Sequence, residues 1–182
     1  MICETGRLRL RPFKLKDAGF ILQLLNEPTF IENIADKGVR TLKDARAYLR
    51  EGPMASYARF GFGLNLVELR ETQTPIGMCG LLKRESLDDV DIGYAFLAEY
   101  RSLGYALESA RAIIELCRQP FKFPRIVAVV NPGNQASIRL LGKLGFVFER
   151  MCRLDPKCPE IAMYACDFSE HQVSETAPAN QA

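Results

Sequence analysis

The sequence has one histidine, and none of its six cysteines form a Cys-x-x-Cys pair. The histidine, His171, lies in a polar segment near the end of the chain. Ser-His-Asp and Cys-His catalytic centres need an imidazole beside the nucleophile. Protein zinc sites usually use histidine or clustered cysteine. We therefore expect a chemistry that uses neither histidine nor a metal ion.

Long apolar runs and an excess of one charge are also absent. No run approaches the roughly 18 apolar residues of a membrane span, and residues 1–7 do not begin a signal peptide. Lys plus Arg is 24 and Asp plus Glu is 22, which gives a net charge of +2. This balance argues against a dedicated nucleic-acid-binding protein. We expect a cytoplasmic protein with reduced thiols, no membrane contact and no direct binding to nucleic acid.

The length and composition fit one globular domain. The chain has 182 residues, and a domain typically has about 150. Hydrophobic residues make up 48% and charged residues 25%, which is ordinary for a packed core. We expect a single domain over residues 1–168, followed by a polar tail over residues 169–182.

The order of sequence patterns predicts an α/β (α+β) fold. Polar–apolar alternation, β-branched runs and turn signals predict strands, and apolar residues three and four apart predict helices. The expected strands are 7–11, 62–69, 76–83, 90–96, 126–130, 146–151 and 160–168. The expected helices are 16–25, 42–50, 105–117 and 134–144, with Gly52 and Pro53 ending the second. Short connections between the strands from 62 to 96 predict an antiparallel meander.

The stretch from the strand at 90–96 to the helix at 105–117 carries the clearest chemical signal. The first N–H groups of a helix lack intrahelical partners, and the helix dipole adds positive charge there. Arg101 adds a formal charge beside this anion site, while Gly104 and Ala106 allow close approach of a ligand. The stretch is neither a P-loop nor a Gly-x-Gly-x-x-Gly motif. Many similar loops bind nothing, so anion binding and a plain connection both stay open on these grounds.

The motif Arg101-x-x-Gly104-x-Ala106 resembles the pyrophosphate loop of the GNAT superfamily of acyl-CoA-dependent N-acyltransferases. Further motifs resemble the branch that contains ribosomal-protein N-terminal acetyltransferases. In chain order these are Arg7-Leu8-Arg9-Leu10-Arg11-Pro12, Lys16-Asp17-Ala18, Asp91-Ile92-Gly93-Tyr94, Asn131-x-x-Asn134-x-x-Ser137 and Lys143-Leu144-Gly145-Phe146. The resemblance covers about residues 5 to 168.

This resemblance implies a central mixed, mainly antiparallel, twisted sheet of about six to seven strands flanked by helices. It also implies that the sheet is splayed near the end of strand 90–96, where acetyl-CoA binds as co-substrate. The implied cofactor contacts are Phe96, Leu97 and Ala98 to the pantetheine arm, Arg101, Ser102, Leu103, Gly104, Tyr105 and Ala106 to the pyrophosphate, and Asn131 and Asn134 to the arm. On local grounds alone, Asn134 is a helix N-cap.

The implied reaction is direct acetyl transfer to a primary amine, of a protein N-terminus or of a small molecule. Asp91 is the carboxylate best placed to deprotonate the amine, and the alternative is an exposed strand residue. Leu141 stands where many members place a tyrosine acid. Tyr94 and Ser137 are then the catalytic candidates for the leaving thiolate, with structural or cofactor-binding roles as the alternative.

Two other functions stay open. One is a CoA-binding regulatory or interaction module without catalysis, which the leucine at position 141 motivates. The other is an α/β domain with an unrelated ligand. The acceptor is expected to face the link from 28 to 40 and a loop from 52 to 61. A homodimer through an exposed sheet edge is possible, but no motif specifies one.

Overall fold

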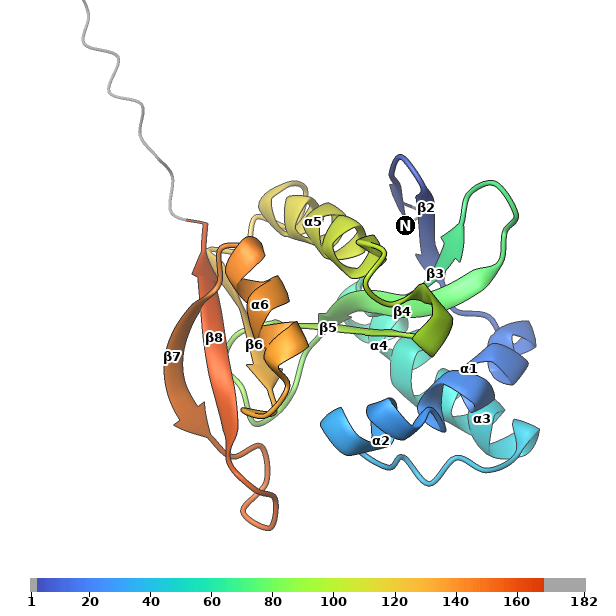
Figure 1. Cartoon of the computed structure of the whole chain (residues 1–182), viewed down its shortest axis with the longest axis horizontal. Helices are drawn as coiled ribbons and strands as arrows, with labels where there is room; N and C mark the ends of the chain where they lie inside the picture. The colour runs from blue at the N-terminus through green and yellow to red at the C-terminus, as the bar shows by residue number, and fades with distance from the viewer. Residues whose placement is uncertain (1–2, 169–182) are drawn as a thin grey trace, which may run out of the picture.

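A twisted sheet forms the centre of the computed structural model, which describes residues 3–168 (Figure 1). Its strands are β1 (Cys3–Glu4), β2 (Leu8–Pro12), β3 (Leu64–Leu69), β4 (Pro75–Leu82), β5 (Asp91–Phe96), β6 (Arg125–Val130), β7 (Val147–Cys152) and β8 (Ile161–Asp167). Across the sheet they lie in the order β1-β2-β3-β4-β5-β6-β8-β7. In this described part, neighbours are antiparallel except for β5 and β6.

The expected mixed, mainly antiparallel α/β architecture is confirmed. The described residues hold eight strands rather than six or seven. The additional strand is β1, whose two residues are too few to produce a period-two pattern. The segment 169–182, expected to be a polar tail, lies outside the described residues.

The helices form two groups. They are α1 (Ala18–Leu25), α2 (Pro28–Asn33), α3 (Leu42–Leu49), α4 (Ala55–Phe60), α5 (Tyr105–Arg118) and α6 (Gln135–Lys143), with short 3-10 turns at Leu15–Asp17 and Ala98–Tyr100. One buried cluster joins α5 and α6 to the sheet, and a second joins α1–α3 to the sheet. Figure 1 accordingly shows α5 and α6 on one face and the α1–α4 group on the other.

Two expectations about the segments before β3 are wrong. Gly52 and Pro53 do not end the second helix, because a π-helical turn over Arg50–Met54 carries the chain into α4. The wide turn accommodates a proline that has no N–H to donate. The segment 52–61 is therefore largely helical. The link from 28 to 40 also begins as a helix, α2, with Pro28 at its first turn.

The sheet divides between β5 and β6. β4 and β5 pair over six residues, and so do β6 and β8. β5 and β6, in contrast, pair only at Asp91 and Val127. Beyond that contact the two parallel strands separate, as expected for a sheet splayed near the end of β5. The separation leaves the backbone of two strand ends open to a ligand.

Candidate active site

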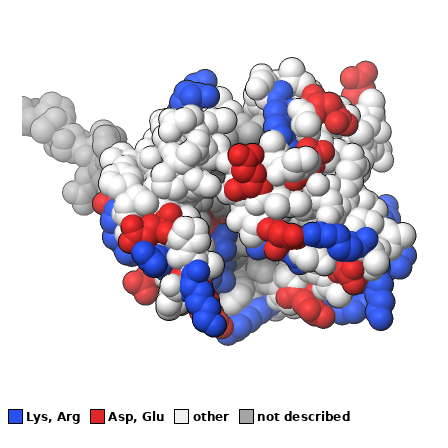
Figure 2. All heavy atoms as spheres, turned by 60° about the horizontal axis from the view of Figure 1, so that its bottom comes forward, with Lys and Arg blue, Asp and Glu red and all other residues white. Residues whose placement is uncertain are grey.

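A cleft of about 670 Å³ occupies the place where β5 and β6 separate. Tyr94, Ala95 and Phe96 of β5 form one wall, and residues 128–130 of β6 form the other. α2 borders one side, and α6 and the start of α5 border the rest. Figure 2 shows the face that lies at the bottom of Figure 1, where the surface is hollowed and acidic and basic side chains are interspersed.

The loop before α5 presents an open helix N-terminus to this cleft. Ser102 and Gly104 have positive φ angles of 60° and 83°, which turn the chain tightly into the helix. Gly104 is the N-cap and offers no side-chain hydrogen bond to the first N–H groups of α5. Ser102, Gly104 and Ala106 all line the cleft. Uncapped N–H groups and the dipole of a 14-residue helix give this place the chemistry that can hold an anion.

The Arg101 side chain forms a hydrogen bond to the end of β5. Its Nε donates to the Phe96 carbonyl oxygen at 2.9 Å, and its Nη2 lies 3.2 Å from Glu27 Oε2. Arg101 still lines the cleft, but Glu27 offsets the charge that the sequence analysis assigned to anion binding. The anion site therefore depends mainly on backbone N–H groups.

Other expected cofactor residues lie outside the cleft lining. Leu97 is buried, and its N–H donates to the Ile76 carbonyl oxygen at 3.0 Å, so it is not free to polarise a thioester. Ala98 and Leu103 are exposed outside the cleft lining, and Tyr105 packs under the Arg7 guanidinium.

The two asparagines differ in placement. Asn131 is exposed, and its Oδ1 accepts a hydrogen bond from the Gly133 N–H at 2.9 Å within a turn. Asn134 lines the cleft and also caps α6, with Oδ1 accepting from the Ser137 N–H at 3.0 Å. The N-cap interpretation of Asn134 is thus confirmed, and it leaves the amide nitrogen of that side chain available to the cleft.

Asp91 lies where β5 and β6 part, and it is only 1% exposed. The alternative of an exposed strand aspartate is therefore wrong. The Arg84 Nε donates to Asp91 Oδ2 at 2.6 Å. Burial nevertheless raises the pKa of Asp91 to about 6, and Arg84 offsets only part of that rise. A carboxyl group with such a pKa is ionised near pH 7 and still basic enough to take up a proton.

Tyr94 and Ser137 form a hydroxyl pair across the cleft. The Tyr94 hydroxyl and Ser137 Oγ are 2.7 Å apart, and both residues line the cleft. Burial raises the pKa of Tyr94 to about 12. One hydroxyl proton is shared within the pair, so the second is free to be donated to a ligand. Leu141 also lines the cleft and is fully buried, and its apolar side chain has no proton to donate.

Sequence reasoning missed Arg84, which lies in the irregular connection between β4 and β5 and belongs to no motif that predicts a site. The expected link from 28 to 40 does reach the cleft, through Thr29 and Asn33 of α2. The other expected segment, 52–61, does not line the cleft. The local signal for Arg84 is Asp91, seven residues later in the sequence. That spacing predicts a contact only when the position of Asp91 in β5 is known.

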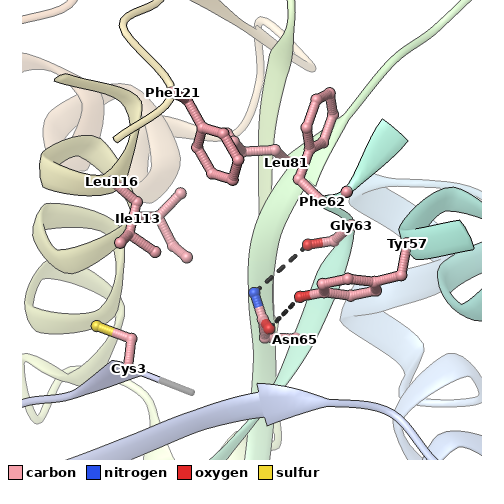
Figure 3. Close-up of a pocket in the computed structure, with 10 residues that line it drawn as sticks. Cys3, Tyr57, Phe62, Gly63, Asn65, Leu81, Ile113, Leu116 and Phe121 are labelled. Atoms are coloured by element: carbon pink, nitrogen blue, oxygen red, sulfur yellow. Dashed lines mark hydrogen bonds between the residues drawn. The ribbon is translucent and has the colours of Figure 1, made fainter. Parts of the chain in front are cut away.

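A second, smaller cavity lies between β3, β4 and α5 (Figure 3). Its volume is about 20 Å³, enough for a single water molecule. The Tyr57 hydroxyl hydrogen-bonds to Asn65 Oδ1 at its edge, and the Asn65 amide donates to the Gly63 carbonyl oxygen at 3.4 Å. The cavity is too small for an acyl donor or acceptor.

Neither a metal-binding cluster nor a membrane-spanning helix occurs among residues 3–168. No three His, Cys, Asp or Glu side chains of this range are grouped so that they could hold a metal ion. No helix in the same range combines the length and the apolar character required to cross a bilayer. The Cys79 thiol is fully buried, and burial raises its pKa to about 12, which disfavours the reactive thiolate.

Comparisons with known proteins agree with this geometry. Residues 7–147 match the acetyltransferase (GNAT) domain. Two curated relatives come from Bacillus subtilis (strain 168). The uncharacterized N-acetyltransferase YnaD is 30% identical over 145 residues, covering 80% of this chain and 82% of its own length. The uncharacterized protein YkkB is 29% identical over 155 residues, covering 82% and 87%.

A solved structure has the same fold. RimL, a ribosomal L7/L12 α-N-protein acetyltransferase solved in complex with coenzyme A, superposes with a TM-score of 0.79. It is 18% identical, and the match covers 92% of this chain and 98% of RimL. The domain match over residues 7–147, the splayed sheet and the open helix N-terminus beside it agree, and the chain belongs to the GNAT acetyltransferase family.

Proposed function

We propose that the protein is an acetyl-CoA-dependent N-acetyltransferase that transfers an acetyl group directly to a primary amine. One observation carries the proposal: the cleft between β5 and β6 ends at the uncapped N-terminus of α5. That arrangement fits a long ligand with a diphosphate at one end. The acceptor is the amine of a protein N-terminus or of a small molecule.

The residues present fit acetyl-CoA. The N–H groups from 102 to 106 would hold the diphosphate, since the Arg101 N–H already donates to the Ala98 carbonyl oxygen at 3.2 Å. The open edge of β5 before the Phe96 carbonyl, which Arg101 occupies, would pair with the pantetheine arm. Asn134 would contact the same arm through its amide nitrogen. When bound, acetyl-CoA supplies the thioester whose acetyl group passes to the amine as the CoA thiol leaves.

Asp91, Tyr94 and Ser137 are the proposed catalytic groups. Asp91 accepts the proton that the amine nitrogen loses as its lone pair forms the new C–N bond, with a water molecule relaying the proton. The free hydroxyl proton of the Tyr94–Ser137 pair is donated toward the sulfur as the C–S bond breaks. The high pKa of Tyr94 keeps this proton in place at neutral pH. Each amide formed thus releases one thiol.

The test combines a cofactor-binding assay with a turnover assay. Gly104→Glu places a carboxylate in the anion site, and its added Cβ would lie 3.3 Å from Arg7 Nη2. Gly145→Glu is the matched control, because its φ of 86° is similar, no atom lies near its Cβ position, and it does not line the cleft. We expect the Kd for CoA to rise at least about tenfold in the first variant only, a loss of about 1.4 kcal/mol.

Wild-type protein should also release thiol from acetyl-CoA only when an amine is added. CoA binding that is equal in wild type and Gly104→Glu contradicts the proposed cofactor site. Binding without turnover across a broad panel of amines and N-terminal peptides supports a non-catalytic CoA-binding module instead. The buried Leu141 is the observation that favours this second candidate.

A further inference from the structure

Arg84 lies at the end of the cleft remote from the diphosphate site. Its partner Asp91 begins β5, and the loop toward α5 follows Phe96, at the other end of that strand. Five residue steps at about 3.3 Å separate the two ends by about 17 Å. Arg84 lines the cleft, and its side chain is 33% exposed. Its charge therefore faces the acceptor end of the cleft rather than the cofactor phosphates.

The Arg84–Asp91 contact uses one atom from each side chain. Arg84 Nε donates to Asp91 Oδ2. The two Nη groups of Arg84 and the Oδ1 atom of Asp91 have no hydrogen-bond partner among residues 3–168. An arginine that neutralises a buried carboxylate frequently forms two parallel bonds to it. The observed contact instead leaves the outer donors of a fixed guanidinium turned to the cleft.

Cations outnumber carboxylates in the lining of the cleft. Among residues 3–168, the charged lining residues are Asp91 and the cations Arg84, Arg101, Arg139 and Lys143. The carboxylates of Glu32, Glu85 and Asp88 belong to neighbouring segments and do not line the cleft. The described lining therefore has an excess of positive charge and no carboxylate apart from the proposed base.

We propose that the acceptor amine carries a carboxylate, which the Nη groups of Arg84 bind while Asp91 faces the amine. The inference rests on the proposed function. Since Arg84 and Asp91 touch, the carboxylate and the amine of the acceptor lie within a few bonds of each other. Free amino acids have this chemistry, and so do N-termini with an acidic residue in the first or second position.

The experiment compares matched acceptors with wild-type enzyme. Free L-amino acids are paired with their C-terminal amides, and the peptide amide Ser-Asp-Phe is paired with Ser-Asn-Phe. We expect at least about a tenfold higher kcat/KM for the acidic member of one pair, the factor that one charge-assisted hydrogen bond supplies. Preference in the first set identifies a small-molecule acceptor, and preference in the second identifies a peptide.

Variants of Arg84 test whether this side chain gives the preference. Arg84→Gln should bring the acid-to-amide ratio of kcat/KM near one, mainly through a higher KM for the acidic acceptor. Arg84→Lys should restore part of the ratio, since lysine keeps the positive charge but lacks the planar guanidinium that can form two parallel hydrogen bonds. Arg111→Gln is the control, because Arg111 is exposed on α5 and does not line the cleft. A general loss of folding or of Asp91 function changes both members of a pair equally.

The two proposals fail in different ways. Equal turnover of acids and amides, or a preference that survives in Arg84→Gln, overturns the inference and leaves acetyl transfer standing. Turnover confined to amines without a carboxylate also overturns it. Absence of thiol release with every amine, acidic or neutral, contradicts the proposed function itself.

Discussion

The Asp91 carboxyl group combines deep burial with a cationic neighbour, and the two act on its charge in opposite directions. Burial disfavours the charged form, while Arg84 at 2.6 Å favours it. Burial is the stronger effect, and the pKa rises to about 6. In an unfolded chain the same carboxyl titrates near 4. The folded protein therefore holds its proton more tightly than the unfolded chain does.

This difference predicts a stability change with pH. Between pH of about 4 and 6 the unfolded chain has lost the Asp91 proton and the folded protein still holds it. The Asp91 contribution to stability is therefore fully present below pH 4 and is lost as the pH rises through 6. We expect Asp91→Asn to remove this loss from the free energy of unfolding measured between pH 4 and 7. Asp88→Asn, at an exposed site, should leave the profile as in wild type.

The same variant should be catalytically impaired. A general base contributes about 10²–10⁴-fold, so kcat/KM of Asp91→Asn should fall by this factor at pH 7.5. The pH profile of wild type should steepen below about pH 6 as Asp91 takes up a proton, and that steepening should be absent from the variant. An Asp91→Asn enzyme with wild-type activity would exclude Asp91 as the base.

At the scale of elements, β3 and β4 approach one another through glycine. A Cβ on Gly80 would lie 2.2 Å from the Gly63 carbonyl oxygen and 2.8 Å from the Leu64 Cα. Both are backbone atoms of the neighbouring strand region, so neither can rotate away. Glycine at position 80 is thus required by the spacing of two strands, and β4 in turn positions β5 along the cleft.

Substitution of two glycines by alanine should have opposite effects. Gly80→Ala forces backbone apart and should destabilise the protein by about 1–3 kcal/mol. Gly142→Ala, at an exposed α6 position with no atom within 4 Å, should stabilise it by about 0.5–1 kcal/mol. Urea unfolding of both variants measures the difference. If Gly80→Ala were as stable as wild type, the close approach of β3 and β4 would be wrong.

The whole molecule consists of two sheet halves that meet at one backbone pair. β1–β5 and β6–β8 are joined within the sheet at Asp91 and Val127, and α5 and α6 pack in one cluster across the division. A ligand that spans the cleft contacts both halves. Its binding should therefore stabilise the folded molecule as a unit.

CoA should raise the melting temperature in a concentration-dependent way. At 100 times its Kd, a ligand that binds only the folded state adds about 2.7 kcal/mol to the free energy of unfolding. Gly104→Glu, with a Kd at least about tenfold higher, should lose about half of this gain or more at the same CoA concentration, and Gly145→Glu should keep it. A thermal shift by differential scanning calorimetry measures both. An identical CoA-induced shift in all three proteins would show that CoA binds elsewhere.

The long elements were predictable because their sequence patterns are local. The apolar spacing of α5, the β-branched run of β6 and the asparagine cap of α6 each reflect neighbours within a few residues. The segment around Pro53 was not predictable, since a π-helical turn accommodates the proline there and the burial of Pro53 supports it. β1 was missed because its two residues depend on their pairing with β2.

The cleft residues also fall into those that a local sequence pattern predicts and those that only the packing of distant segments brings together. The loop from Arg101 to Ala106 is contiguous, so its uncapped helix start could be recognised in the sequence alone. The sequence by itself also determined the family, since the acetyltransferase domain match spans residues 7–147. Only the tertiary structure decided the burial and raised pKa of Asp91, its contact with Arg84 and the Tyr94–Ser137 pair. Burial, and hydrogen bonds between distant segments, depend on how the elements pack, and no local pattern of residues encodes that packing.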